Sequence, residues 1–423
     1  MKKSARSLVV LVVGVLGLVS CNGGVSIKKP PSGITTRVLA SQSASGPASF
    51  AGLYIIDGEI DSLVRGGISA GSSPGLMVTS PERSVLLSFD QLTNKVDVIN
   101  TTKESTSGSI QLAGPTTSMV VPLPEVGFAA VPATPFIGSA PGAVVEMNLT
   151  SGGITATISV PNAQTVVSNA TGTQLVAFSS DSDAVTVVSP LLVNTGSPVT
   201  VTVPGFDRPV YGFYSGSNVY ILNCGAECGG TQASVQVLNF ATNPPTAGAV
   251  LPVDGATIGL VSGSTLYVAG NSPANSACTG ETTAAATCGR LDLVDLNSMT
   301  VTASIVITDG YHDRIDMGSN NQLFIGSHTC TNIGNVNNPQ GEVRGCLSVY
   351  NTLNGSVVIP PDNGDVTGLQ DFTTRYVEYV AEGGNLRVYY TLTDTLYENE
   401  QYIPTGTIVI TGVITDVKAI DFF

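Results

Sequence analysis

The amino-acid sequence predicts an all-β chain folded as a β-propeller of four-stranded antiparallel blades, and two observations carry this prediction. Four short β-rich runs separated by turn residues lie between Thr257 and Asp309, the pattern of one four-stranded sheet. Similar groups follow small turns at residues 71, 114, 161, 205, 255, 310 and 364. A period of about 40 to 50 residues is typical of propeller blades. Seven unit starts predict seven blades, with six or eight left open.

The strands can be placed in two of these units. In the first unit we expect strands at 75–79, 84–89, 95–100 and 109–112. In the third unit we expect them at 165–167, 174–179, 184–188 and 199–203. A ring must also close, because open sheet edges pair with other chains. We therefore expect strands within 51–69 to complete the last blade, which is built mainly from residues 364–423.

The composition fits a globular, turn-rich chain. Of its 423 residues, 42% are hydrophobic and only 11% are charged, so a core can form and the chain is not disordered. Tryptophan is absent, which excludes a WD-type repeat signature. The formal net charge of −14 argues against binding to nucleic acid, whose phosphates would be repelled.

The first residues have the features of an export signal. Three basic residues precede an apolar run from Leu8 to Leu18, which is short for a membrane-spanning helix. Leu18-Val19-Ser20-Cys21 resembles the bacterial lipobox, which implies cleavage after residue 20 and a lipid on Cys21. A plain signal peptide with an incidental Cys21 is the alternative. By resemblance to a known sorting rule, Asn22 favours the outer membrane.

Three segments follow from this interpretation. Residues 1–20 form the signal peptide, residues 21–49 form the lipidated cysteine and a flexible tether, and residues 50–423 form one propeller domain. The tether is expected because its Gly, Ser, Pro and Lys content shows no apolar periodicity. The lipid would be the contact with the membrane.

The six remaining cysteines predict disulfides, because their number is even and the chain is exported. Each pair lies between the second and third strand of its unit. The expected pairs are Cys224 with Cys228, Cys278 with Cys288, and Cys330 with Cys346. A zinc site is the alternative for the first pair, whose spacing suits metal ligands. We expect no metal and no cofactor.

Two segments resemble the YVTN and NHL families of propellers. Residues 94–102 (NKVDVINTT) are similar to the third strand of such a repeat, and residues 266–271 (LYVAGN) are similar to the second. The resemblance implies a propeller in which the loops between second and third strands, and those between blades, share one face around the central channel. No unit has the full repeat signature, so no functional residue transfers.

Polar residues concentrate in two inter-blade segments that should lie on this face. The candidate ligand-binding residues there and in the sixth unit are Asp207, Arg208, His312, Asp313, Arg314 and His328. Arginines can clamp a carboxylate or phosphate, and histidines can bind metal or carry protons. The plainer interpretation is that the arginines pair with the adjacent aspartates and that the histidines are hydrogen-bonded or solvated.

These observations favour a binding or scaffold module over an enzyme, since no GxSxG elbow, P-loop or HExxH motif is present. The expected partner is an envelope protein, a peptide or an envelope polymer, bound through the disulfide-braced face. A propeller enzyme of the lactonase or lyase kind, with its site at the channel mouth, is the alternative. A structural subunit of an envelope assembly is a third possibility.

Overall fold

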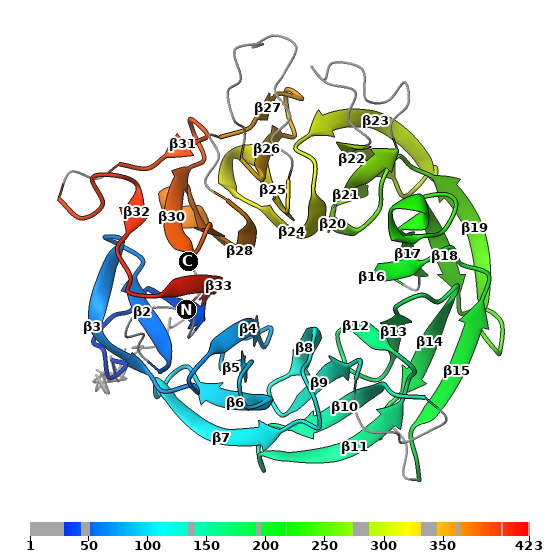
Figure 1. Cartoon of the computed structure of the whole chain (residues 1–423), viewed down its shortest axis with the longest axis horizontal. Coiled ribbons are helices and arrows are strands. Elements are labelled where there is room, and N and C mark those ends of the chain that lie inside the picture. Colours follow the sequence, from blue (N-terminus) through cyan, green and yellow to red (C-terminus); the bar gives the residue numbers. More distant parts are fainter. Residues whose placement is uncertain are drawn as a thin grey trace, which may run out of the picture.

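The strands form eight antiparallel sheets arranged as the blades of a propeller (Figure 1). This arrangement comes from a computed structural model, which describes residues 29–43, 51–133, 140–191, 196–216, 218–273, 287–330, 345–360, 364–398 and 401–421. Within each blade the strands follow one another outwards, so the first strand lines the central channel. The eight innermost strands are β4, β8, β12, β16, β20, β24, β28 and β33.

The first four blades are each a simple up-and-down sheet. Blade 1 consists of β4 (Pro74–Thr79), β5 (Val85–Asp90), β6 (Lys95–Asn100) and β7 (Ser105–Gln111). Blade 2 consists of β8 (Ser118–Leu123), β9 (Val126–Val131), β10 (Ala143–Asn148) and β11 (Gly153–Ser159). Blade 3 consists of β12 (Ala163–Ser168), β13 (Leu175–Ser179), β14 (Ala184–Ser189) and β15 (Val199–Pro204). Blade 4 consists of β16 (Pro209–Ser215), β17 (Asn218–Asn223), β18 (Ser234–Asn239) and β19 (Thr246–Pro252), with the short 3₁₀ helix η1 (Gly225–Cys228).

The other four blades complete the ring. Blade 5 consists of β20 (Ile258–Ser262), β21 (Thr265–Pro273), β22 (Thr287–Asp295) and β23 (Thr300–Ile307). Blade 6 consists of β24 (Tyr311–Met317), η3 (Ser319–Asn321), β25 (Gln322–His328), β26 (Leu347–Asn351) and β27 (Val357–Val358). Blade 7 consists of β28 (Val366–Phe372), η4 (Thr373–Arg375), β29 (Val377–Glu382), β30 (Asn385–Tyr390), β31 (Thr395–Leu396) and β32 (Thr407–Ile408). Blade 8 consists of β33 (Val413–Ala419), β1 (Arg37–Ser43), β2 (Leu53–Asp57) and β3 (Ser62–Ile68).

The predicted all-β architecture and blade junctions are confirmed. Each of the seven expected turns lies just before the innermost strand of a blade. The expected strand at 95–100 coincides with β6, and the outer strand of blade 1 begins four residues earlier than expected, at Ser105. Sequence periodicity therefore placed blades 1 to 7.

The predicted closure is confirmed in part, since β2 and β3 lie within 51–69 and share a blade with the C-terminal strand β33, but the most favoured count of seven blades is wrong. Residues 364–408 form a blade of their own, so the N-terminal strands do not complete it. They join β33 instead, with Val38 opposite Ala419 and Ser43 opposite Val413, and make an eighth blade. The expected tether is also too long, since Arg37–Ser43 is a strand whose first six residues are buried. The propeller thus begins before residue 50.

The core lies between neighbouring blades. Middle strands are covered on both faces, so successive residues pack into different clusters. In β17, Val219 and Ile221 pack towards blade 3, whereas Tyr220 and Leu222 pack towards blade 5. For this reason the middle strands appear in the sequence as continuous apolar runs. No helix within the described ranges has the length and apolar character needed to cross a bilayer.

Candidate functional site

Several innermost strands contain a β-bulge, at which one residue is left out of the pairing with the next strand. In β12, β16 and β24 the register skips one residue against the next strand, at Gln164, Val210 and Asp313 respectively. Such bulges re-aim a side chain and are common beside functional sites. All three skipped residues line one cavity in the central channel. The bulges therefore bring three residues into the wall of the channel.

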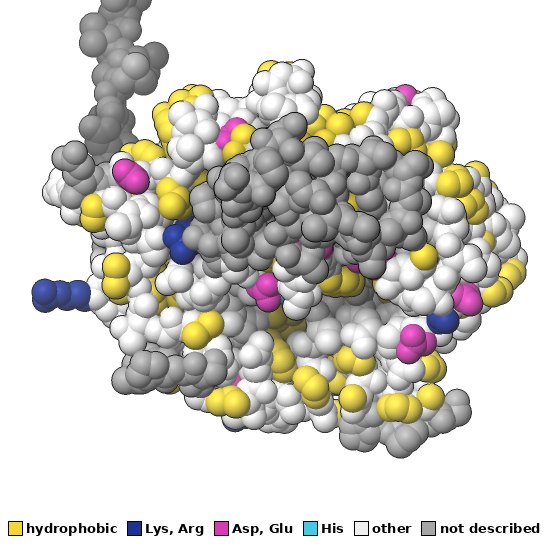
Figure 2. Space-filling view, turned by 45° about the horizontal axis from the view of Figure 1, so that its top comes forward, with side chains coloured by type: hydrophobic (Ala, Val, Ile, Leu, Met, Phe, Trp, Pro, Cys, Tyr) yellow, Lys and Arg dark blue, Asp and Glu magenta, His cyan; other side chains and the backbone are white. Residues whose placement is uncertain are grey.

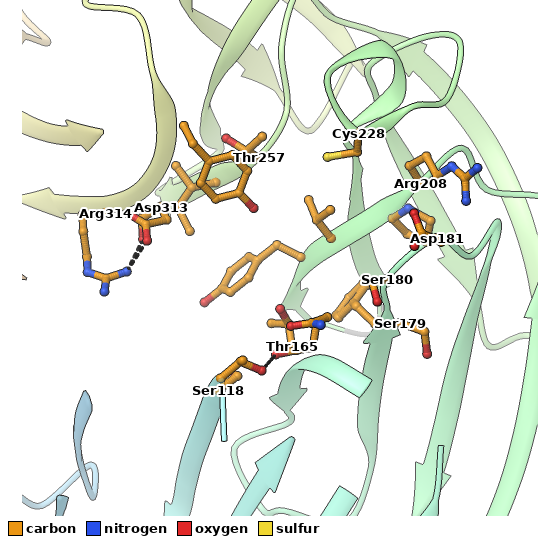
Figure 3. A pocket seen from close by; sticks show the side chains of 18 of the residues that line it. Ser118, Thr165, Ser179, Ser180, Asp181, Arg208, Cys228, Thr257, Asp313 and Arg314 are labelled. Carbon is orange, nitrogen blue, oxygen red and sulfur yellow. Dashed lines mark hydrogen bonds and ion pairs between the residues drawn. The ribbon is translucent and has the colours of Figure 1, made fainter. Parts of the chain in front are cut away.

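The cavity has a volume of about 670 Å³ and is walled by the inner strands of several blades. Figure 2 shows the surface hollowed near the centre of the ring, with apolar side chains in the walls of the hollow. Asp313 and Arg314 lie on one side of the pocket, and Ser179, Ser180 and Asp181 lie on the other (Figure 3). Cys228, from a loop between second and third strands, also lines it, so the cavity lies towards the loop-bearing face. A second space of the channel, lined partly by Arg314 and Lys418, continues from it.

Three of the predicted residues form one charged cluster. The Asp313 carboxylate lies 3.0 Å from Arg314 Nη1 and 2.9 Å from His328 Nε2. The angle between the His328 imidazole and the carboxylate oxygen is not that of a hydrogen bond, so this contact is a close pairing of ionisable groups. Contact with Asp313 raises the pKa of His328, against the opposing effect of partial burial. Asp313 thus lies between a guanidinium and an imidazole whose pKa it raises.

Gly310 lets the end of β25 approach the start of β24. Its φ is +97°, and a Cβ there would lie 2.5 Å from the carbonyl oxygen of His328. A side chain at this position would be strained and would clash with backbone. The glycine therefore helps to hold His328 next to Asp313.

His312 does not join this cluster, contrary to its prediction as a ligand-binding residue. Its side chain is fully buried, and its Nε2 lies 2.9 Å from the carbonyl oxygen of Thr308. Burial lowers the pKa of His312 to about 4, although the Thr308 contact and nearby Asp309 oppose this. The imidazole is neutral at pH 7 and serves the packing of blade 6.

The buried imidazole predicts an acid-sensitive stability. An ordinary histidine in the unfolded chain takes up a proton near pH 6.5, whereas His312 in the folded chain does so near pH 4. Stability is thus complete above pH 6.5 and falls between pH 6.5 and 4, by up to about 3 kcal/mol. We expect His312→Gln to lose less stability than the native chain when denaturant unfolding is compared at pH 7 and pH 4.5.

His328 provides a control of opposite sign. Its raised pKa stabilises the folded chain below the unfolded value and loses this effect as the pH rises. His328→Gln should therefore increase the loss on acidification. Equal losses for the native chain and His312→Gln would contradict the assignment of a neutral buried histidine.

Asp207 and Arg208 lie on the loop-bearing side but act differently from each other. The Asp207 carboxylate accepts hydrogen bonds from the backbone of Thr231 at 3.0 Å and Gln232 at 2.8 Å, and so holds the loop after η1. Burial raises the pKa of Asp207, but these bonds, the Thr231 hydroxyl and Arg208 outweigh it and lower the pKa overall. Arg208 lines the cavity, with its Nε 3.8 Å from Asp183. Asp207 is structural, and Arg208 lies at the edge of the cavity with its guanidinium pointing away from the middle of it (Figure 3).

Two of the three predicted disulfides are confirmed. Cys224 and Cys228 are bonded, as are Cys330 and Cys346. The zinc alternative for the first pair is therefore wrong. Cys278 lies outside the described residues, so its pairing with Cys288 stays a prediction. In the described part of the chain, no cluster of three acidic, histidine or cysteine side chains could hold a metal ion.

Two residues of the channel mouth were not predicted. Tyr211 lines both spaces of the channel, and a bulge directly precedes it in β16. Glu227, inside the first disulfide loop, accepts hydrogen bonds from the backbone and side chain of Asn271, at 2.8 and 3.2 Å. Burial raises the pKa of Glu227 to about 7, against these hydrogen bonds. Its place inside a predicted disulfide loop was the available signal.

Comparison with known proteins supports the fold and leaves the activity open. No family model matches the sequence, and no curated protein matches it. Solved structures do match: the dihydro-heme d1 dehydrogenase NirN has a TM-score of 0.59 at 11% identity, over 93% of this chain and 79% of that chain. The chain has a propeller fold.

Two further matches have the same character. A functionally unknown protein from Desulfotomaculum acetoxidans has a TM-score of 0.51 at 12% identity, over 78% of this chain and 99% of that chain. The periplasmic gluconolactonase of Pseudomonas aeruginosa has a TM-score of 0.47 at 14% identity, over 91% of this chain and 98% of that chain. At such identities the likeness concerns the fold alone, and the YVTN and NHL resemblance stays a prediction.

Proposed function

We propose that this protein is an exported, lipid-anchored propeller that binds a ligand at the mouth of its channel. The observation that carries the proposal is the cavity of about 670 Å³, to which Arg208, Asp313 and Arg314 all contribute. Concave sites of about 300 to 1,000 Å³ with a few converging polar groups are typical of ligand binding. The partner we propose is an envelope protein, a peptide or an envelope polymer, of which one segment enters the channel.

Binding is favoured over catalysis by the state of the charged groups. Asp313 is engaged by both Arg314 and His328, and Arg208 lies beside Asp183. Among the described residues that line the cavity there is no histidine, because His312 is buried and His328 lies behind Asp313. Of the titratable groups that do line the cavity, Asp313 is already engaged by Arg314 and His328, so we favour binding and keep the lactonase or lyase as the alternative.

Export and anchoring rest on two features. Disulfides form and persist in oxidising compartments, so the two bonds are compatible with an exported protein. Cys21 and the lipobox lie outside the described residues, and lipidation at this position, with an outer-membrane location, is part of the proposal. A single substitution, Cys21→Ser, should release the protein from the membrane fraction of the cells that make it.

Site-specific photo-crosslinking in those cells tests the binding face. A photoreactive amino acid in place of Tyr311, which is 44% exposed and lines the cavity, should give a defined adduct. The same group at Val250, 54% exposed on the outer strand β19, is the matched control and should give none. Arg314→Gln should reduce the Tyr311 adduct. Absence of an adduct at Tyr311, or an equal one at Val250, would rule out a binding site at the mouth.

A further inference from the structure

One wall of the cavity carries polar side chains that have no partner in the protein. Gln164, Thr165, Ser179 and Ser180, all from blade 3, line the cavity, and within the described ranges their side chains form no hydrogen bond. Thr165, Ser179 and Ser180 lie on the same side of the pocket (Figure 3). Hydroxyl and carboxamide groups both donate and accept. This wall suits a ligand rich in hydroxyl groups.

An aromatic ring stands beside this wall. Tyr211 is half-buried and lines both spaces of the channel, and Phe213 holds its ring edge-on at a centroid distance of 5.1 Å. Burial raises the pKa of the Tyr211 hydroxyl, and the positive charge of Arg314 acts against this, as expected for groups that share the channel. A fixed aromatic ring with a polar tip offers apolar contact to one face of a sugar ring and a hydrogen bond at its edge.

Arg314 supplies a positive charge on the opposite side. Its Nε donates to the carbonyl oxygen of Thr367 at 2.7 Å, and its Nη1 donates to the carbonyl oxygen of Asp313 at 2.9 Å. Within the described residues, Nη2 is the guanidinium nitrogen left without a protein partner, and the side chain lines both spaces. A carboxylate is the group that an arginine N–H edge recognises best among common ligands of this size.

The charge of the cavity lining does not oppose an anionic ligand. The cavity is lined by two arginines, Arg208 and Arg314, and two aspartates, Asp181 and Asp313, so its formal charge is zero. The next space adds Lys418, whose Nζ lies 2.9 Å from Asp416 Oδ1. The whole chain carries −14. The lining of the cavity thus lacks the net negative charge that the chain as a whole carries.

We propose that the ligand of this mouth is an acidic saccharide, with a carboxylate at Arg314, a sugar ring against Tyr211 and hydroxyl groups on the blade 3 wall. This inference rests on the proposed function and names the chemistry of its ligand. A cavity of about 670 Å³ holds one or two sugar units of a longer polymer.

Calorimetric titration of the purified protein with two matched probes tests this. The probes are methyl glucuronide, which carries a carboxylate, and methyl glucoside, which carries a hydroxymethyl group in the same place. We expect the acid to bind about tenfold more tightly or better, as one charge-assisted contact provides. Arg314→Gln should remove that preference, and Tyr211→Ala should weaken the binding of both probes. Arg65→Gln, on the exposed outer strand β3, is the matched arginine control and should change nothing.

Equal affinity for the two probes, no binding of either, or equal effects of Arg314→Gln and Arg65→Gln would overturn the inference. The two proposals fail separately. Adducts at Tyr311 without saccharide binding would reject the acidic saccharide and keep the binding face. Loss of both the adducts and the saccharide binding would reject the proposed function as well.

Discussion

Asp61→Asn is expected to lower the free energy of unfolding by about 3 kcal/mol or more, because it removes one charge of a buried ion pair. The Asp61 carboxylate is inaccessible, and it accepts hydrogen bonds from Arg375 Nη1 at 2.7 Å, Arg375 Nη2 at 2.6 Å and the Tyr379 hydroxyl at 2.5 Å. The pair joins blade 8 to blade 7. In the variant, the Arg375 guanidinium remains mostly buried without its counter-charge.

Asparagine is the informative replacement at this position. The φ of Asp61 is +55°, a left-handed conformation that asparagine adopts more readily than most residues, so the backbone is not the cause of the loss. Asp57→Asn in the same turn is the control. Among the described residues its carboxylate accepts one exposed hydrogen bond, from the Glu59 backbone, and we expect a loss below about 1 kcal/mol.

Denaturant unfolding of a double-mutant cycle with Arg375→Gln measures the coupling between the two charges. We expect a large coupling energy, because Arg375→Gln removes the buried positive charge that Asp61→Asn leaves without a counter-charge. Losses that simply add, or an Asp61→Asn loss as small as that of Asp57→Asn, would show that the pair does not join the two blades.

The seven junctions were predictable because their signal is local. Each is a short turn with glycine, proline or asparagine before a strand, and turn residues are chosen by backbone conformation. Gly310, with φ +97°, is an example. Strand positions followed for the same reason, as in β6, whose bounds are those of the expected strand.

The eighth blade was not predictable in the same way. Its innermost strand β33 and its second strand β1 pair residues as far apart as Val38 and Ala419. The strand β1 reads RVLASQS, half polar, within a stretch whose composition is typical of a tether. Its polar residues are nonetheless buried and bonded, as Ser41 Oγ donates to the carbonyl oxygen of Gly75 at 2.7 Å. Composition reports the average of a segment and misses such specific partners.

The proximity of three candidate residues followed from the expected topology. Asp313, Arg314 and His328 do meet, because the inter-blade segments and the second strands end on one face. Strand alternation alone does not tell which residues of 311–314 face the channel, since the bulge at Asp313 depends on the register with β25. For the same reason His312 was counted among the candidate residues although its side chain is buried inside blade 6. Bulges are properties of strand pairs and have no signature in one strand.

Removal of β33 is expected to abolish the cooperative folding of the ring. A chain ending at residue 411 lacks the innermost strand of blade 8 and leaves the edge of β1 unpaired from Val38 to Ser43. It also loses the fully buried side chain of Val417 and the nearly buried Ile414. These losses together are of the order of the whole stability of a domain, about 5–15 kcal/mol.

The strand also links the two neighbouring blades, so its loss opens the ring on both sides. Asp416 accepts a hydrogen bond from the Met77 backbone of blade 1 at 2.9 Å, and the Ala419 backbone donates to Gln370 of blade 7 at 2.9 Å. An exposed β1 edge is then free to pair with other chains. We expect the shortened chain to self-associate and to lack the sharp thermal transition of a chain ending at residue 421.

A peptide of residues 411–423 added in trans separates a missing strand from a general defect in folding. Because an open sheet edge accepts an extended segment by backbone hydrogen bonding, the peptide should restore a monomer with a sharp thermal transition. The same peptide with Val417→Asp, which places a charge in the blade interface, should fail to do so. A shortened chain that stays monomeric and unfolds as sharply as the chain ending at residue 421 would show that seven blades suffice. The strand β33 would then not be needed for the ring to fold.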